Sequence, residues 1–215
     1  FALGLGFPRS PVDSMLAFNV VFGKTVPDIS LNAIANLGYA SGRFGQPVYP
    51  GDTLSSTSTV IGLKENRDGK TGVVYVNSRG TNQRGEMVLD YCRWVMVRKK
   101  DAASPAPAAV VPELPDSVAA ADLVVPVDLE IEKYDCALAG STDLWNDYQV
   151  GEQIDHVDGM TIEESEHMMA TRLYQNTAKV HFNQHAEKSG RFGRRIVYGG
   201  YVISMARSLS FNGLA

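Results

Sequence analysis

The stretch that decides the fold is Pro11-Val-Asp-Ser-Met-Leu-Ala-Phe-Asn-Val-Val-Phe22. It is apolar nearly all round, which is typical of a helix that is buried on most of its sides, and a glycine directly after it can end the helix. Three runs rich in Val, Thr, Tyr and Trp follow and predict β-strands at Thr53–Ile61, Gly72–Gly80 and Met87–Arg98. Turns with Asn, Asp and Gly separate them and favour antiparallel hairpins. The sequence therefore predicts an α+β fold in which an antiparallel sheet surrounds a buried central helix.

Composition limits the class of protein. With 215 residues, of which 44% are apolar, the chain can build one large domain or two small ones. A net charge of −4 argues against nucleic acid or an anionic membrane surface as the main partner. Two cysteines are too few for a disulfide framework and favour a reducing compartment, so we expect a cytoplasmic protein. No apolar run approaches the roughly 20 residues that span a bilayer.

The chain divides into three segments. Residues 1–101 hold the central helix and sheet described above. Residues 102–127 are rich in Pro and Ala and predict a surface linker with little regular structure, most simply a passive tether. Residues 128–215 form the third segment.

The third segment is predicted to begin with a strand. Trp145–Glu152 and Gln153–Val157 are interpreted as this entry strand. Thr161 and Glu164 have the spacing of a capping box, which predicts a helix that runs to about Tyr174.

A weak internal repeat relates the two ends of the chain. Phe7, Arg9 and Val12 align with Phe192, Arg194 and Val197 at a constant offset of 185 residues. The alignment places Asp13-Ser14 opposite Tyr198-Gly199. The chain is then expected to start at the central helix of one repeat and to stop at the central helix of a second, as an incomplete stretch of a longer protein.

A polar loop in the third segment carries the candidate chemistry. It is Tyr174-Gln-Asn-Thr-Ala-Lys-Val-His181, and it precedes a predicted helix that opens at Gly199-Gly200. These stretches resemble the signature of the MaoC-like, (R)-specific enoyl-CoA hydratase family, Asp-x-Asn-Pro-x-His followed by Gly-Phe-x-x-Pro-Ile-x-His-Gly. Asn176 stands where that family has Asp, Ala178 where it has Asn and Lys179 where it has Pro. Two further stretches are similar to the same domains: Arg43-Phe-Gly-Gln-Pro-Val-Tyr-Pro-Gly-Asp-Thr-Leu54 and Asn82-Gln-Arg-Gly-Glu86.

The resemblance implies a double hot-dog fold and the reversible hydration of an enoyl-CoA thioester. Carried over position by position, His181 becomes the general acid/base and Gly199 the backbone donor to the thioester oxygen. Asn176 falls on the position of the family's Asp, where an amide can orient water but cannot accept a proton. The first repeat has Asp13 near its helix start, which would oppose an oxyanion, so that repeat is expected to be non-catalytic and to shape the acyl pocket.

The predicted substrate-binding residues surround the same helix start. They are Gly200, Tyr198, Arg194, Arg195 and Lys179, and with Arg191 and Lys188 the cations form a basic cluster that suits coenzyme A phosphates; a solvated loop is the alternative. The Lys24-Thr-Val-Pro-Asp-Ile-Ser-Leu-Asn-Ala33 stretch resembles the mesaconyl-CoA branch of the family. That branch carries a dicarboxylic acyl group, whose distal carboxylate Arg43 or Arg172 could meet. His156, His167 and His185 lack metal-ligand spacing and receive no role.

Three functions remain open at this stage. The first is a hydro-lyase that acts on an acyl-CoA, with no metal and no cofactor beyond the coenzyme A of the substrate, as a homo-oligomer without nucleic-acid or membrane partners. The second is a non-catalytic hot-dog domain that binds acyl-CoA or serves as a scaffold. A thioesterase is a distant third, because it would usually want a carboxylate near the helix.

Overall fold

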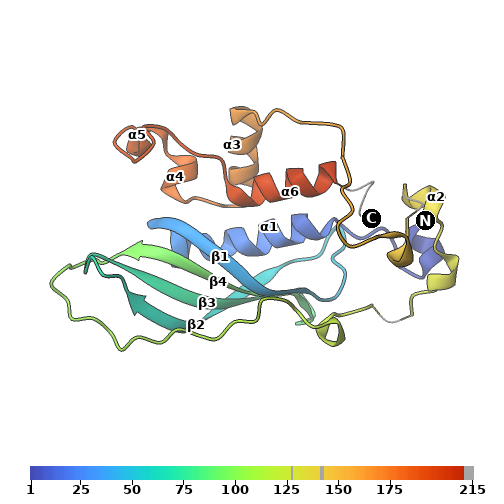
Figure 1. Cartoon of the computed structure of the whole chain (residues 1–215), viewed down its shortest axis with the longest axis horizontal. Coiled ribbons are helices and arrows are strands. Elements are labelled where there is room, and N and C mark those ends of the chain that lie inside the picture. Colours follow the sequence, from blue (N-terminus) through green and yellow to red (C-terminus); the bar gives the residue numbers. More distant parts are fainter. Residues whose placement is uncertain (127, 141–142, 211–215) are drawn as a thin grey trace.

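The computed structural model describes residues 1–126, 128–140 and 143–210 (Figure 1). One helix, α1 (Ser14–Thr25), lies between a four-stranded sheet and a second helix, α6 (Gly199–Leu209). No helix in the described part of the chain is both long enough and apolar enough to cross a membrane.

Helix α1 confirms the predicted buried helix. It begins at Ser14 because the Asp13 carboxylate accepts a hydrogen bond from the Met15 N–H at 2.7 Å and so caps the first turn. It passes beyond Phe22 and continues into a π-helical turn, Val26–Ser30. The inward side chains of α1 and the first residue of this turn are fully or almost fully buried and form the centre of the core: Ala17, Val21, Phe22 and Val26.

The sheet confirms the three predicted strands and adds a fourth. The strands are β1 (Ala33–Phe44), β2 (Ser55–Glu65), β3 (Thr71–Thr81) and β4 (Met87–Arg98). They pair antiparallel in the order β1-β4-β3-β2, so the predicted hairpins β2–β3 and β3–β4 are confirmed. Strand β1, which was not predicted, pairs with β4. Together with α1 they give the α+β, hot-dog arrangement of a helix wrapped by a sheet (Figure 1).

Residues 102–126 follow the sheet instead of hanging free. Val110 forms a two-way backbone bridge with Leu63 of β2, with N···O distances of 2.8 and 2.9 Å. A Cβ on Gly62 would lie 2.7 Å from Pro112 Cδ, so a glycine is needed where the segment crosses the strand. Apart from this bridge and a short 3-10 turn at Ala120–Asp122, the described residues of the segment form no regular structure; Val127 lies outside the described residues.

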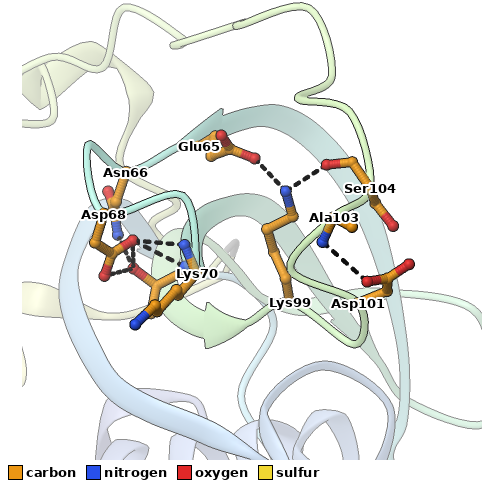
Figure 2. Close-up of polar contacts among 9 residues, drawn as sticks. Glu65, Asn66, Asp68, Lys70, Lys99, Asp101, Ala103 and Ser104 are labelled. Atoms are coloured by element: carbon orange, nitrogen blue, oxygen red, sulfur yellow. Dashed lines mark hydrogen bonds and ion pairs between the residues drawn. The ribbon is translucent and has the colours of Figure 1, made fainter.

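The start of this segment is bonded to the ends of β2 and β4 through Lys99 (Figure 2). Lys99 Nζ lies 2.6 Å from Glu65 Oε2 and donates to the Ser104 carbonyl at 2.6 Å. In the neighbouring β2–β3 turn, the Asp68 carboxylate accepts hydrogen bonds from the backbone N–H groups of Lys70 and Thr71. These contacts close the end of the sheet at which β2 turns into β3 and β4 runs into the linker.

The predicted entry strand of the third segment is wrong. Trp145–Asp147 forms a 3-10 turn, and the chain from Tyr148 to Glu163 is irregular and largely exposed. A strand needs a partner for its N–H and C=O groups, and in the part of the chain that the structure describes none lies beside this stretch.

The predicted capping box is also wrong. Helix α3 (Glu164–Leu173) begins after Glu163, and no side chain caps it. Thr161 therefore lies outside the helix, while Glu164 and Glu166 occupy the first turn, where negative charge suits the helix dipole. Short helices follow α3: α4 (Lys179–Phe182) and α5 (Gln184–Glu187); a further short helix, α2 (Cys136–Ala139), precedes it.

Helices α1 and α6 obey the 185-residue offset. They begin at Ser14 and Gly199, which are equivalent positions, and the equivalent residues Asn19 and Ser204 share a hydrogen bond of 2.9 Å. The helices run antiparallel, since the Asp13 carboxylate near the start of α1 pairs with Arg207 near the end of α6 at 3.2 Å. The start of α6 therefore lies at the end of α1 (Figure 1).

Candidate active site

The start of α6 is an uncapped helix terminus. The side chain of its N-cap residue, Tyr198, makes no capping hydrogen bond, and among the described residues the N–H groups of Gly199 and Gly200 donate no hydrogen bond. Gly199 is exposed, and a Cβ built on it would meet nothing within 4 Å. The structure thus places a free backbone donor, with helix-dipole support, next to open space.

Gly200 and Tyr198 serve packing. Tyr198 is 2% exposed, its ring stacks on Phe22 at 5.7 Å between centroids, and its hydroxyl donates to Asn19 Oδ1 at 2.8 Å. Burial raises the pKa of Tyr198 well above its ordinary value, so the hydroxyl stays protonated. A Cβ on Gly200 would lie 2.3 Å from the Tyr198 ring, which explains this glycine by close contact between α1 and α6. Both residues thus take part in the contact between α1 and α6, and their role in substrate binding stays a prediction.

His181 is held against the segment that leads into α6. Its Nδ1 lies 2.9 Å from the Ile196 carbonyl oxygen, and the Ile196 N–H donates to Val180 O at 3.0 Å. Because a carbonyl only accepts, Nδ1 carries the proton of the neutral ring and Nε2 keeps its lone pair. Burial lowers the pKa of His181, against smaller opposite effects of the Ile196 carbonyl and Glu187. The ring is therefore neutral near pH 7 and suited to act as a base, 5.8 Å from the Tyr198 ring.

Asn176 lies in the same loop, and its side chain is directed elsewhere. It is 1% exposed, and its Oδ1 accepts a hydrogen bond from the Ala178 N–H at 3.4 Å. Its own N–H donates to Thr171 O at 2.9 Å. Within the described residues no contact joins the Asn176 amide to His181. The structure thus places His181 and Gly199 near one helix start, while the Asn176 amide bonds within its own loop, and its catalytic role stays a prediction.

His167 is a site residue that the sequence analysis missed. It is 3% exposed, and its Nε2 accepts a hydrogen bond from the Tyr198 N–H at 3.0 Å. Its ring meets the His181 ring edge-on with centroids 6.2 Å apart. The signal in the sequence was its place on one face of α3 with Ala170 and Thr171, at spacings of three and four residues, which marks a polar residue on a buried face.

The predicted basic cluster is divided in the structure. Arg195 pairs with Glu164 at 3.7 Å, whereas Lys179 and Arg194 are exposed. Arg191 lies over the ring of Phe192, 5.4 Å from its centroid. Among the described residues no contact joins these cations to one another.

The two arginines considered for a distal carboxylate lie apart. Arg43 is on β1, opposite Asp90 of β4, and Arg172 is exposed on α3. No group of three or more His, Cys, Asp or Glu side chains in the described ranges is arranged to hold a metal ion.

Known proteins share both the sequence and the fold. The mesaconyl-CoA hydratase family matches residues 2–212. The chain is 71% identical to a β-methylmalyl-CoA dehydratase of Chloroflexus aurantiacus and 65% identical to a mesaconyl-CoA hydratase of Cereibacter sphaeroides, in each case over all of its 215 residues. It spans 61% and 62% of the lengths of these two relatives.

Solved structures agree. A MaoC domain protein dehydratase from Chloroflexus aurantiacus superposes with a TM-score of 0.95 at 70% identity, over 100% of this chain and 61% of that one. Rv0216 of Mycobacterium tuberculosis, described as a double hot-dog fold, shares the fold with a TM-score of 0.59 at 22% identity, over 97% of this chain and 63% of that one. On the family match and the two close relatives, the chain belongs to the mesaconyl-CoA hydratase family.

Proposed function

We propose that this chain carries the acid/base and oxyanion groups of a hydro-lyase that interconverts mesaconyl-CoA and β-methylmalyl-CoA. The observation that carries the proposal is that a neutral, half-buried histidine lies next to an uncapped helix start. His181 Nδ1 is hydrogen-bonded to the Ile196 carbonyl oxygen, three residues before Gly199, whose N–H has no partner among the described residues. Relatives of 71% and 65% identity are named for the two directions of this reaction. Their names denote enzymes, which does not favour a non-catalytic acyl-CoA-binding domain.

The chemistry follows from these groups. Hydration adds a water oxygen to the β-carbon of the enoyl thioester and a proton to the α-carbon, while negative charge builds on the thioester oxygen. His181 Nε2 removes the proton from the attacking water, and the Gly199 N–H donates to the oxygen that becomes negative. The His181 imidazolium then returns its proton to the α-carbon. Burial lowers the pKa of His181 and so makes the imidazolium a stronger acid for that second transfer.

His181 must perform both proton transfers in this scheme. The Asn176 amide cannot accept a proton, and its Oδ1 is turned to the Ala178 N–H. Lys179, Arg194 and Arg195 are proposed to contact the coenzyme A phosphates. The proposal includes a cytoplasmic homo-oligomer with no cofactor beyond the coenzyme A of the substrate. The two free cysteines support the reducing compartment, and light scattering on the full-length protein tests the oligomer.

Loss of the mesaconyl-CoA absorbance on mixing with full-length enzyme is the direct assay. His181→Ala is expected to lower kcat about 10²–10⁴-fold, the usual size of a lost general acid/base. His185→Ala is the matched control, because His185 is an exposed residue of α5, three residues after the end of α4, and is given no role. Full activity of His181→Ala would overturn the proposal.

Asn176→Asp tests the second residue. It restores the carboxylate of the wider family at a position that is 1% exposed. If His181 alone moves protons, the substitution lowers or merely preserves kcat. A rise in kcat with a new acid limb in the pH profile would show that a carboxylate can take over one of the transfers.

A further inference from the structure

Tyr198 is held at both of its ends. Its N–H donates to His167 Nε2 of α3 at 3.0 Å, and its hydroxyl donates to Asn19 Oδ1 of α1 at 2.8 Å. Tyr198 and His167 are 2% and 3% exposed, so water does not compete for these bonds. The residue directly after Tyr198 is Gly199, whose N–H donates no hydrogen bond among the described residues and whose Cα borders open space. Whatever fixes the Tyr198 backbone therefore sets the direction of the Gly199 donor.

His167 can hold this bond only as a neutral ring of one tautomer. Because Nε2 accepts, the proton of the neutral ring is on Nδ1. A second proton on Nε2 would point at the Tyr198 N–H and replace a hydrogen bond with two opposed donors.

The surroundings of His167 favour its neutral form. The His181 and Tyr201 rings face it at centroid distances of 6.2 and 6.5 Å, and the charged Arg195 and Glu164 lie beside it. Burial lowers the pKa of His167 most, His181 and Arg195 lower it further, and only Glu164 raises it. Glu166, also on α3, is engaged by the Tyr201 hydroxyl at 2.9 Å.

We propose that His167 is a positioning residue for the proposed hydration: its neutral Nε2 holds Tyr198 so that the Gly199 N–H points to the thioester oxygen. The inference rests on the proposed function. His167 acts through the backbone of Tyr198 and not on the substrate, because the nitrogen that could exchange a proton is already used by that backbone N–H.

Two substitutions at position 167 separate this role from an acid/base role. His167→Gln keeps an acceptor near the position of Nε2, while His167→Leu removes it. In the full-length enzyme, His167→Leu is expected to lower kcat about 10–100-fold with KM little changed, since a donor displaced by an ångström loses on this scale. His167→Gln is expected to stay within a few-fold of the parent and to show a flatter acid limb in the pH profile of kcat, because Gln does not titrate. Met169→Leu, at a position of α3 that is 62% exposed, is a control for general damage to this helix.

Three results would overturn the proposal. His167→Gln as impaired as His167→Leu would mean that the ring itself transfers protons. Unchanged kcat in folded His167→Leu would mean that the bond is irrelevant. The ¹⁵N shifts of His167 in the wild-type enzyme provide a readout that needs no substitution and no substrate: a protonated Nδ1 and a free Nε2 at pH 7.5 are expected, and a protonated Nε2 would refute the hydrogen bond. Failure to hydrate mesaconyl-CoA would instead overturn the proposed function, and the tautomer would still be read.

Discussion

The contact between α1 and α6 supplies the most specific stability prediction. Asn19 is 2% exposed and joins the two helices through its amide, which accepts from the Tyr198 hydroxyl at 2.8 Å and donates to Ser204 Oγ at 2.9 Å. The same nitrogen donates to Met15 O at 2.8 Å. The perturbation is a double-mutant cycle with Asn19→Ala and Tyr198→Phe.

Each single substitution leaves one buried polar atom without a partner. Asn19→Ala orphans the Tyr198 hydroxyl, whereas Ser204 Oγ keeps its bond to Gly200 O at 2.7 Å. Tyr198→Phe leaves Asn19 Oδ1 without a donor. An orphaned buried group costs about 1–3 kcal/mol, so each variant is expected to lose free energy of unfolding in this range. The double variant removes both atoms, and its loss is expected to be smaller than the sum by about 1 kcal/mol or more.

Chemical denaturation of the full-length protein, followed by tryptophan fluorescence, measures the cycle. Tyr49→Phe is the control for loss of a tyrosine hydroxyl, because in the described part of the chain the Tyr49 hydroxyl has no hydrogen bond. Losses that add to within about 0.5 kcal/mol would show that Asn19 and Tyr198 are not coupled, and the account of this interface would fail.

Three further predictions use the same unfolding assay. Arg93 is 0% exposed, bonds only to hydroxyls and lies 4.5 Å from the centroid of the Phe22 ring, with no carboxylate partner among described residues. Arg93→Met is therefore expected to have a free energy of unfolding equal to or above that of the parent, and a loss above about 2 kcal/mol would contradict this. Lys99→Met is expected to cost about 0.5–1 kcal/mol through its pair with Glu65, less at 1 M salt, and an unchanged midpoint would refute the pair's role. Burial lowers the pKa of His167 and His181, so below about pH 6.5 the unfolded chain binds more protons than the folded one. The free energy of unfolding should therefore fall as the pH drops below this value. Replacement of both by Gln should flatten that slope, and an unaltered slope would rule them out as its source.

The core of the fold could be predicted from the sequence because its signals are local. The apolar stretch of α1 and the β-branched runs of β3 and β4 each carry their own pattern. Strand β1 has no such pattern, since it includes Gly38, Ser41 and Gly42; it is a strand because β4 pairs with it. Gly38 is required by a neighbour far along the chain, as a Cβ there would lie 2.3 Å from the Trp94 ring.

The site divides in the same way. The loop motif and the glycine pair pointed to His181 and Gly199; the structure places both near the start of α6, and their catalytic roles stay predictions. The role of His167 could not be predicted, because its hydrogen-bond partner is the backbone N–H of Tyr198, which is 31 residues away and leaves no trace in the residue types. The expectation that Tyr198 binds substrate stays a prediction; the packing of its ring on Phe22 of α1 could not be predicted, because it depends on how the two helices meet.

The carboxylate that caps α1 has a consequence for stoichiometry. Both central helices begin at equivalent positions, yet Asp13 fills the start of α1 with its own negative charge and is held there by Arg207, while the start of α6 stays open. The first terminus is thus occupied by an internal anion and cannot also receive a thioester oxygen. Under the proposed function, the two equivalent helix starts then offer a single oxyanion site, and titration of the protein is expected to saturate at one acyl-CoA for each polypeptide, with hyperbolic and not biphasic binding.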